Sequence, residues 1–504
     1  MKNAAMTSLI NTPQKASVAL VAFMTLIHLI MAFHVELGGD EAHYALYGLM
    51  PDWSYFDHPP LIGWLQMLPM ALLPFDWAAR LVPITLYALL NYLLYRVTIE
   101  LFGDQSAADN NAGWLGFFSL VLLNSSLILS LMGMAMLPDN PLMVIVLALL
   151  LVIKRMMDSG KRIRLSLWLW LGVLVGLAAL AKYTAITIVV SLVAIMLMEK
   201  RFYWLKQPGL YLAVAISALM LLPVLYWNAS HDWASFIYQI NHGTHSDSWQ
   251  IERLLQTQAI QLIVYSPLIF VAGWLMMLKA SNYINPANHS RRLLLAFALP
   301  VTLLFGWGSG FEPSLPHWTS LAWLLLIPIV ADSLWQQRQK RWVKNVIAAH
   351  LLIMVPLVLL LHSFIYQPWI AFADYKHPLQ GDYGWPEAAA KAEQLQQQIQ
   401  QQSDAKKPAL FVSNWSYASH LAWYARPQPV FITSSMQTQF EFWYGRPQAG
   451  MDGLLVAPHY EPNPPLTNEA NHFESCQRID QLDMHGDDNI IVSYYFYHCR
   501  NYLP

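Results

Sequence analysis

The stretch SVALVAFMTLIHLIMAFHVEL, residues 17–37, is followed at once by Gly38-Gly39-Asp40-Glu41-Ala42-His43-Tyr44. About 20 predominantly apolar residues suffice to cross a bilayer as a helix, so this stretch predicts a membrane span. It is too long for the apolar region of a secretory signal and lacks an A-x-A-like cleavage site, so we expect the span to be retained. A carboxylate is costly near lipid. The pair Asp40-Glu41 therefore indicates a polar site at the membrane surface.

The composition of the chain is typical of a membrane protein. Of its 504 residues, 56% are hydrophobic and only 12% are charged, whereas soluble domains carry about 25% charged residues. Trp, Tyr and Phe make up 13%, which suits a chain with many membrane–water interfaces. The net charge of −2 gives no sign of a nucleic-acid partner. We expect membrane lipids around the protein and no nucleic acid.

The apolar pattern predicts a polytopic α-helical membrane protein with about 11 transmembrane helices. Each predicted span is close to the length that a bilayer requires. The spans are 17–37, 81–101, 113–133, 141–157, 165–181, 183–198, 208–228, 258–278, 293–309, 317–335 and 345–366. The shorter, Pro-bounded stretch 61–74 is more typical of an interfacial or re-entrant segment. A hairpin gained or lost would change the count by two and leave the sidedness unchanged.

The positive charges between the spans predict the orientation. Cytoplasmic loops are enriched in Lys and Arg, and the basic clusters at 154–164, 200–206, 279–292 and 338–344 all fall on the side of the N-terminus. We therefore expect a multi-pass protein of the bacterial inner membrane with its N-terminus in the cytoplasm. Everything after about residue 367 is then periplasmic.

The last part of the chain has a different pattern. Trp385-Pro386-Glu387 predicts the start of a helix, because Pro suits an early helical position. Short apolar runs at 409–412, 430–433, 454–457 and 490–497 predict strands. These elements indicate a small α/β domain.

We therefore expect a transmembrane domain at 1–366, with a first outer loop at about 38–80, and a soluble domain at 367–504. Both cysteines of the chain, Cys476 and Cys499, lie in the soluble domain. An oxidising compartment would favour a disulfide between them. Such a bond would stabilise the domain by roughly 3 kcal/mol. Two unpaired thiols are the alternative.

Two further acidic signals lie outside the apolar spans. Asp57 is part of Tyr55-Phe56-Asp57-His58-Pro59-Pro60, and Asp139 is part of Leu137-Pro138-Asp139-Asn140-Pro141. An outward-facing Asp can take a proton from a hydroxyl group, which typically contributes about 100- to 10,000-fold in rate. Helix capping is the ordinary alternative, with Asp40 before a helix that begins at Glu41 and Asp139 before one that begins at Asn140.

Lys182, in Leu180-Ala181-Lys182-Tyr183-Thr184, lies between two apolar runs. An ammonium group in such a place requires an anion. That anion is either a carboxylate of the protein or a phosphate of a substrate, since Lys binds phosphate as a point charge. His58 is either a second phosphate contact or part of a rigid turn before Pro59-Pro60.

Four more polar residues are candidates for contacts to a substrate or a metal. They are His242 and His245, with H-x-x-H spacing, and Glu312 and His317. Zinc uses His and carboxylate ligands, but the H-x-x-H pair lies in a Gly-containing loop. Hydrogen bonding to phosphate or sugar is therefore favoured, and we expect no essential metal or other cofactor. The sequence has no P-loop, G-x-G-x-x-G or C-x-x-C pattern that would indicate ATP or nicotinamide chemistry.

Taken in order, these motifs resemble those of the GT-C membrane glycosyltransferases. The blocks are Gly39-Asp40-Glu41-Ala42-His43-Tyr44, Phe56-Asp57-His58-Pro59-Pro60-Leu61, Pro138-Asp139-Asn140-Pro141-Leu142 and Leu180-Ala181-Lys182-Tyr183-Thr184. The chain looks most like the bacterial branch related to protein O-mannosyltransferases, lipid A aminoarabinose transferase and lipid A galacturonosyltransferases. Pro316-His317-Trp318-Thr319 and Gln439-Phe440-Glu441-Phe442-Trp443 are similar to later blocks of that branch.

The resemblance implies a GT-C fold with residues 1–366 as the catalytic domain. It also implies a polyprenyl-phosphate-linked sugar donor at the outer leaflet, and an inverting transfer of a hexose or pentose. The acceptor would be an envelope lipid or glycan such as lipid A or lipopolysaccharide. Asp40 matches the expected base, and Glu41 and Asp139 would orient the acceptor or the base.

The same resemblance bears on the donor phosphate. Asp57 and His58 match the position where the aminoarabinose branch tends to carry an acidic residue and Lys before Pro. Because His replaces Lys here, its charge depends on pH. Lys182 is therefore the stronger candidate for the leaving phosphate.

Two other functions stay open. A protein O-glycosyltransferase would use the same kind of donor with a protein acceptor. A lipid-linked glycan flippase or transporter belongs to another class and would also have many helices. Against a transporter, the candidate charges gather at one face instead of the bilayer midplane, and the sequence shows no inverted repeat.

Overall fold

The computed structural model describes residues 12–103, 109–241, 248–279, 288–403, 406–461, 472–486 and 489–503. The chain divides into two compact units, each assembled from three segments. Unit 1 consists of Met1–Ile30, His58–Ile62 and Arg80–His362, and unit 2 of Met31–Asp57, Gly63–Ala79 and Ser363–Pro504. Most of the expected first outer loop therefore shares a unit with the tail of the chain.

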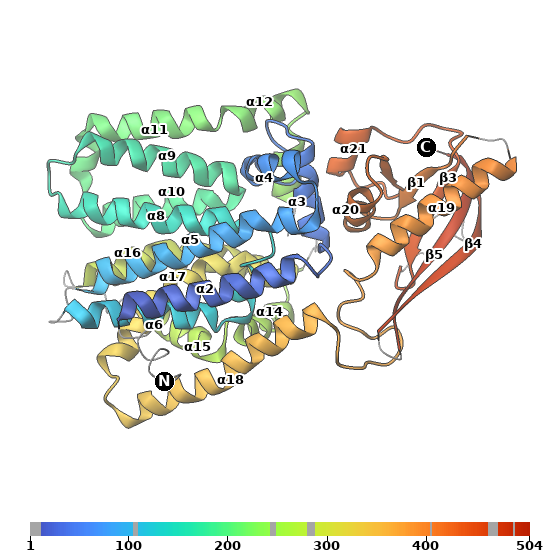
Figure 1. Cartoon of the computed structure of the whole chain (residues 1–504). Coiled ribbons are helices and arrows are strands. Elements are labelled where there is room, and N and C mark those ends of the chain that lie inside the picture. The colour runs from blue at the N-terminus through green and yellow to red at the C-terminus, as the bar shows by residue number, and fades with distance from the viewer. Residues whose placement is uncertain are drawn as a thin grey trace. The chain divides into compact units, whose positions relative to one another are not determined.

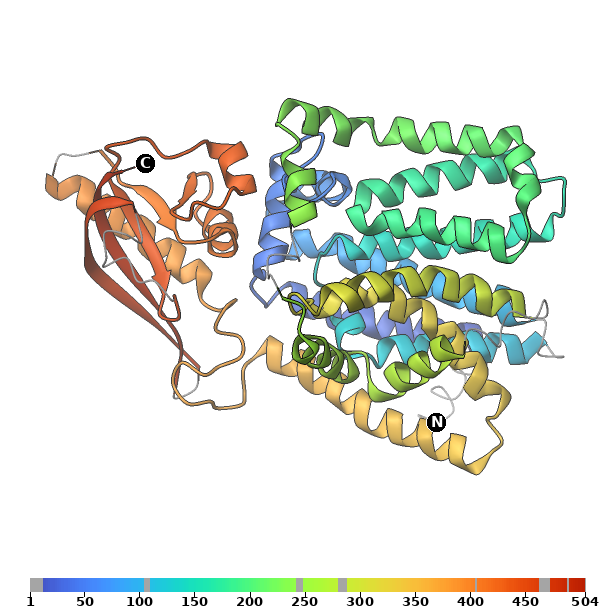
Figure 2. The same ribbon diagram turned by 180° about the vertical axis from the view of Figure 1, so that it is seen from behind.

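The described part of unit 1 is helical. Most of its helices run roughly alongside one another in Figures 1 and 2. The helices wholly or mostly in this unit are α2 (Pro13–Ala32), α5 (Asp76–Phe102), α6 (Asp109–Asn124), α7 (Leu127–Leu131), α8 (Asp139–Asp158), α9 (Leu165–Ala181), α10 (Ile186–Met198), α11 (Pro208–Met220), α12 (Leu222–Ser230), α13 (Ala234–Asn241), α14 (Ile251–Val264), α15 (Pro267–Leu278), α16 (His289–Gly308), α17 (Ser320–Gln336) and α18 (Arg341–Tyr366), with 3-10 helices η2 (Tyr183–Ala185), η3 (Phe202–Lys206) and η6 (Pro316–Thr319).

The chain is a multi-pass membrane protein. Among the described residues, seven helices are long and apolar enough to cross a membrane: Pro13–Ala32, Asp76–Phe102, Asp139–Asp158, Pro208–Ser230, His289–Gly308, Pro316–Gln336 and Arg341–Tyr366. Five shorter apolar helices accompany them, Leu61–Leu72, Asn111–Asn124, Leu165–Ala181, Tyr183–Met198 and Pro267–Leu278. The count of about 11 spans stays a prediction.

Burial differs sharply between the spanning helices of unit 1. The apolar windows of α8 and α17 are 83% buried, whereas that of α18 is only 22% buried. Leu352 and Ile353 of α18 are among its exposed apolar side chains. Apolar side chains that face outward suit a helix surrounded by lipid. The helices α8 and α17 therefore form the interior of the unit, and α18 presents an apolar surface.

The predicted spans 113–133 and 258–278 are interrupted; the first is divided between α6 and α7. The stretch 258–278 contains the end of α14 at Val264 and the start of α15 at Pro267. The residue before a proline is disfavoured in the helical region, and Ser266 has φ 79°. The Ser266 side chain accepts a hydrogen bond from the Ile269 N–H and so caps α15. The apolar pattern alone does not reveal this break.

Unit 2 contains a five-stranded sheet in the order β2-β1-β3-β5-β4. Strands β1, β2 and β3 are parallel, and β5 pairs antiparallel with β3 and β4. The elements wholly or mostly in this unit are α3 (Gly39–Leu49), α4 (Leu61–Leu72), α19 (Trp385–Ser403), β1 (Ala409–Val412), α20 (Trp415–Tyr424), β2 (Val430–Ile432), α21 (Gln439–Tyr444), β3 (Gly453–Pro458), β4 (Phe473–His485) and β5 (Ile490–Tyr502). The helix at 385 and four of the strands lie where the sequence predicts them.

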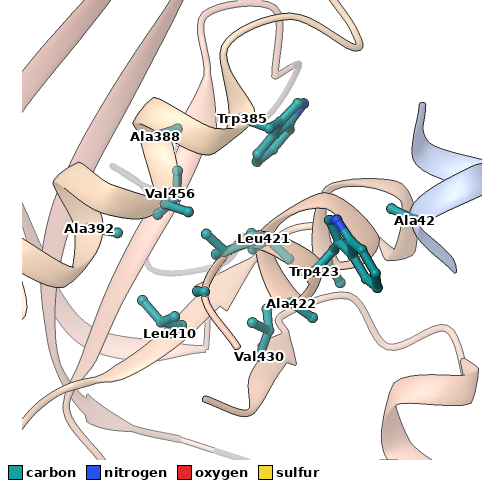
Figure 3. Close-up of a cluster of buried hydrophobic side chains, with 14 of the residues drawn as sticks. Ala42, Trp385, Ala388, Ala392, Leu410, Leu421, Ala422, Trp423, Val430 and Val456 are labelled. Carbon is teal, nitrogen blue, oxygen red and sulfur yellow. The ribbon is translucent and has the colours of Figure 1, made fainter. Parts of the chain in front are cut away.

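The core of unit 2 combines segments from both ends of the chain. Alternate residues of a strand point to opposite faces of the sheet. Leu410 of β1 and Val456 of β3 belong to the larger cluster of buried hydrophobic side chains in this unit. Trp385 of α19 and Trp423 of α20 cover that cluster in Figure 3. Ala42 of α3 packs into it as well. The helix that carries Asp40 is thus anchored by the hydrophobic core of the tail.

Candidate active site

The helix α3 begins immediately before Asp40. Gly38 is its N-cap residue, and the Glu41 carboxylate accepts a hydrogen bond from the Gly38 N–H at 3.1 Å. Asp40 is therefore the second residue of the helix and not its cap. The capping alternative for Asp40 is wrong, because Glu41 satisfies the free N–H at this terminus.

Burial and neighbouring charges control the protonation of Asp40. Burial is the main cause of a raised pKa at Asp40. His43 opposes the increase and the charges of Asp382, Asp57 and Glu41 add to it, and together these effects bring the pKa of Asp40 to about 6. A carboxylate with a pKa closer to neutrality is a better proton acceptor than one with the usual value. The surroundings of Asp40 in unit 2 therefore suit a general base.

His43 connects Asp57 to the tail. Its Nε2 lies 3.4 Å from Asp57 Oδ1, and its Nδ1 lies 3.1 Å from Ser419 Oγ. The Tyr47 hydroxyl also donates to Asp57. The Ser419 hydroxyl also contacts the Trp415 carbonyl oxygen, to which it donates. The described partners of Asp57 are thus protein side chains.

The late sequence block Gln439-Phe440-Glu441-Phe442-Trp443 forms α21 and meets the first loop within unit 2. The Phe56 N–H donates to the Gln439 side chain at 2.7 Å. The rings of Phe440 and Trp443 lie 5.9 and 5.8 Å from that of His43. This part of the tail therefore helps to build the surroundings of Asp40.

Asp139 and Lys182 form a buried ion pair in unit 1. Asp139 is the first residue of α8, and Lys182 follows the last residue of α9. Lys182 Nζ lies 2.7 Å from Asp139 Oδ2, and the two residues are 6% and 2% exposed. The structure therefore realises the alternative in which a carboxylate of the protein neutralises Lys182. Pro138, not Asp139, is the N-cap residue of α8, so the capping alternative for Asp139 is also wrong.

The remaining predicted residues do not assemble into one group. His317, in η6, interacts electrostatically with Asp139 and Lys182. His58 is half-buried in a different segment of unit 1, and Glu312 is exposed. His242 and His245 lie outside the described residues. The described residues contain no group of three or more His, Cys, Asp or Glu side chains that could hold a metal ion.

The predicted site residues thus fall into two groups. Asp40, Glu41 and Asp57 come together in unit 2, and Asp139 and Lys182 come together in unit 1. Sequence reasoning missed several partners in unit 2, namely His43, Tyr47, Asp382 and Ser419. His43 could have been found, because residues three apart on a helix are neighbours. Asp382 and Ser419 carry no local signal of this kind.

Glu36, another carboxylate of unit 2, was also missed. The Glu36 side chain accepts hydrogen bonds from the Gly384 N–H at 3.0 Å and from the Trp385 N–H at 3.2 Å. Burial is the main cause of a raised pKa at Glu36. The two N–H groups oppose the increase and the charges of Glu387 and Asp76 add to it, and together these effects bring the pKa of Glu36 to about 7. Glu36 therefore holds the start of α19 and titrates near neutrality.

Comparison with known proteins gives a consistent result. Residues 57–227 match the dolichyl-phosphate-mannose-protein mannosyltransferase family. The chain is 24% identical over 291 residues to the lipid A galacturonosyltransferase RgtD of Rhizobium johnstonii, which covers 56% of this chain and 58% of that protein. The chain thus matches little more than half the length of this relative.

Solved structures show the fold. The chain resembles ArnT from Cupriavidus metallidurans bound to undecaprenyl phosphate with a TM-score of 0.60 and 16% identity, over 95% of this chain and 97% of that one. The apo form of the same protein gives a TM-score of 0.58 and 15% identity over the same shares. The predicted fold, a helical membrane domain with a small α/β domain, is confirmed.

Proposed function

We propose that this chain, which belongs to the GT-C membrane glycosyltransferases in the bacterial branch of ArnT- and Rgt-like proteins, transfers a sugar from a polyprenyl-phosphate donor to an envelope lipid or glycan. The observation that carries the proposal is the half-buried Asp40 carboxylate at the start of α3, whose pKa is raised to about 6. A base of this kind suits the removal of a proton from an acceptor hydroxyl near neutral pH.

In the proposed reaction, the acceptor oxygen attacks the anomeric carbon of the sugar. A new carbon–oxygen bond forms as the bond to the lipid phosphate breaks, and the phosphate oxygen keeps the electron pair. Asp40 takes the hydroxyl proton, and Glu41 holds the end of α3 that carries it. Attack from the side opposite the leaving phosphate inverts the anomeric configuration.

Positive groups near the leaving phosphate would stabilise its growing charge. Lys182 is the first candidate and His58 the second. The bond between Lys182 and Asp139 holds the Lys182 side chain in a buried place. In this proposal the donor phosphate joins an existing ion pair, and Asp139 orients the ammonium instead of serving as a base. Asp57 was predicted to bind the donor phosphate; because it lies 3.4 Å from His43 Nε2, we propose instead that it positions His43.

The donor and the acceptor follow from the relatives only as proposals. RgtD is named for lipid A, and ArnT was solved with undecaprenyl phosphate. These support a polyprenyl-phosphate donor and a lipid A-like acceptor for this chain. The proposed place is the periplasmic face of the inner membrane, with the N-terminus in the cytoplasm.

The experiment is a transfer assay with purified protein in detergent. Undecaprenyl phosphate-linked galacturonic acid and aminoarabinose serve as donors, and lipid A serves as acceptor. We expect release of undecaprenyl phosphate and a matching mass gain of lipid A, with Asp40→Asn losing about 100- to 10,000-fold in kcat. Asp158→Asn, which removes an exposed carboxylate, is the matched control and should retain activity. Full activity of Asp40→Asn would overturn the role of Asp40.

A protein acceptor is the second candidate, because the family matched at residues 57–227 is named for protein mannosyltransferases. Mass spectrometry of envelope lipids and periplasmic proteins from a deletion strain separates the two. Loss of a sugar from lipid A or another envelope glycan supports the first candidate, and loss from proteins supports the second. A transporter would move the lipid-linked sugar without releasing undecaprenyl phosphate.

A further inference from the structure

A cavity of about 210 Å³ lies in the soluble part of unit 2, beside the edge strand β2. Only about 10–15 Å³ of such space is needed to hold one water molecule, so this cavity admits a small organic group. Its walls come from β2, from the segment that leads through α21, and from the ends of the last two strands. The lining residues used below are Phe431, Ser435, Thr438, Glu441, Arg446 and Tyr502.

Thr438 is the most informative residue in the wall. It is only 6% exposed, and its hydroxyl has no hydrogen-bond partner within the described ranges of the chain. Thr438 is also the N-cap residue of α21, yet its side chain makes no capping bond. A buried hydroxyl without a partner costs about 1–3 kcal/mol. A polar ligand in the cavity would recover that cost.

The other lining groups combine aromatic surface with polar atoms. Phe431 and Tyr502 supply rings, and Ser435 supplies an exposed hydroxyl. The Arg446 Nε lies 3.1 Å from the Glu441 carboxylate, and the Arg446 side chain is 77% exposed. Small-ligand sites typically have apolar and aromatic walls with a few polar groups that fix orientation. A saccharide has both parts, because its C–H faces are apolar and its edges carry hydroxyl groups.

We propose that this cavity is a second saccharide site, which binds the sugar portion of the acceptor away from the reacting hydroxyl. This proposal rests on the proposed function for the identity of the acceptor. Thr438 and Ser435 bond to sugar hydroxyls, the rings of Phe431 and Tyr502 pack on a sugar face, and Arg446 meets an anionic substituent. The cavity thereby contributes to the choice of acceptor and takes no part in the chemical step.

The test uses full-length protein in detergent and a deacylated lipid A–core oligosaccharide as the probe, because deacylation removes binding through acyl chains. Calorimetry gives the Kd of the probe. Ser435→Trp fills the mouth of the cavity, and Thr438→Val removes the buried hydroxyl at nearly constant shape. Met436→Trp is the matched control, since Met436 is the next residue, is 58% exposed and does not line the cavity.

We expect Ser435→Trp to weaken probe binding by about tenfold or more, equivalent to roughly 1.4 kcal/mol. Thr438→Val should weaken it by about three- to tenfold, the range of one hydrogen bond. Met436→Trp and Asp40→Asn should bind like the wild type. In the transfer assay, the cavity variants should raise the KM for the acceptor and leave kcat and the KM for the donor unchanged.

The outcomes separate this site from the transferase proposal. A wild-type protein that does not bind the probe, or cavity variants that bind it normally, would overturn the second site while transfer by the wild type stands. Probe binding that is lost in Ser435→Trp, in a protein that transfers no sugar, would support the site and overturn the proposed function.

Discussion

Lys182 Nζ and Asp139 Oδ2 are 2.7 Å apart, and both residues are almost completely buried. The pair joins the start of α8 to the end of α9. Two opposite charges in such a place depend on each other, because each alone would be a buried charge without compensation. The pair therefore has a structural role that is independent of any phosphate.

Because the two charges depend on each other, we expect their substitutions to have non-additive effects on the stability of the protein. Lys182→Met alone should destabilise the protein by about 3–5 kcal/mol, and the double variant with Asp139→Asn should lose much less. Thermal unfolding of the purified protein in detergent measures both. The same variants test phosphate binding, because the stable double variant should still show a raised KM for the donor. An unchanged KM there would leave Lys182 with the structural role alone.

The raised pKa of Asp40 predicts how activity depends on pH. A base must be unprotonated, so kcat/KM should fall about tenfold per pH unit below about pH 6. His43 lowers the pKa of Asp40, so His43→Gln should move the inflection to higher pH. Initial rates between pH 5 and 8 measure both profiles. A wild-type profile that is flat across this range would contradict the assignment.

Glu36 predicts a pH dependence of stability. Its pKa is about 7 in the folded protein, against a usual value of 4.5. The folded state thus keeps a proton that the unfolded state loses, so the stabilisation is complete below about pH 4.5 and is lost as the pH rises through 7. The loss should reach up to about 3 kcal/mol.

Glu36→Gln should remove this component, because the amide oxygen still accepts the N–H groups at the start of α19 but does not titrate. Unfolding midpoints at pH 5 and pH 8 measure the effect. Glu393→Gln, at an exposed position of α19, is the control and should retain the wild-type difference. Equal pH dependence in all three proteins would exclude Glu36 as the source.

Gly48 predicts a steric effect where α3 meets α4. A Cβ atom at this position would lie 2.9 Å from the carbonyl oxygen of Gln66 and 2.8 Å from its carbonyl carbon. Backbone atoms cannot move aside as a flexible side chain can, so Gly48→Ala should destabilise the protein by about 1–3 kcal/mol. Gly381→Ala is the control, since nothing lies within 4 Å of its Cβ. Unfolding midpoints compare the two.

Cys476 and Cys499 are bonded in the structure and face each other across β4 and β5. Replacing both by Ser should destabilise the α/β domain by roughly 3 kcal/mol in the chain-entropy model. The two cysteines are the only ones in the chain, so thiol labelling of the native protein should detect none. Two reactive thiols before reduction would contradict the bond.

Much of the fold follows from local patterns, and β4 shows where such patterns fail. The helix at Trp385 and the strands β1 and β3 have clear start signals or apolar runs. Strand β4 was not predicted, because most of its 13 residues are polar and only Phe473 is fully buried. It is one of the two edge strands of the sheet. Its pairing with β5 holds it in place, and no periodicity in the sequence of β4 indicates that pairing.

The candidate site shows the same limit. Asp40 and Asp139 could be chosen from sequence, because carboxylates beside apolar spans are unusual. The residues that contact this site are harder to predict, because some of them lie far away along the chain. The Gly39 N–H donates to Asp382, 343 residues away, and no short-range pattern predicts such a contact.

The hydrophobic core of unit 2 also determines an order of events during synthesis. Ala42 of α3 emerges early from the ribosome, whereas Trp385, Trp423 and Val456, which complete its surroundings, emerge more than 300 residues later. Contacts of such large sequence separation form slowly. The segment that bears Asp40 therefore stays incompletely packed until residues 385–456 have been synthesised. A chain that stops before these residues would have its helical bundle but no partner for α3.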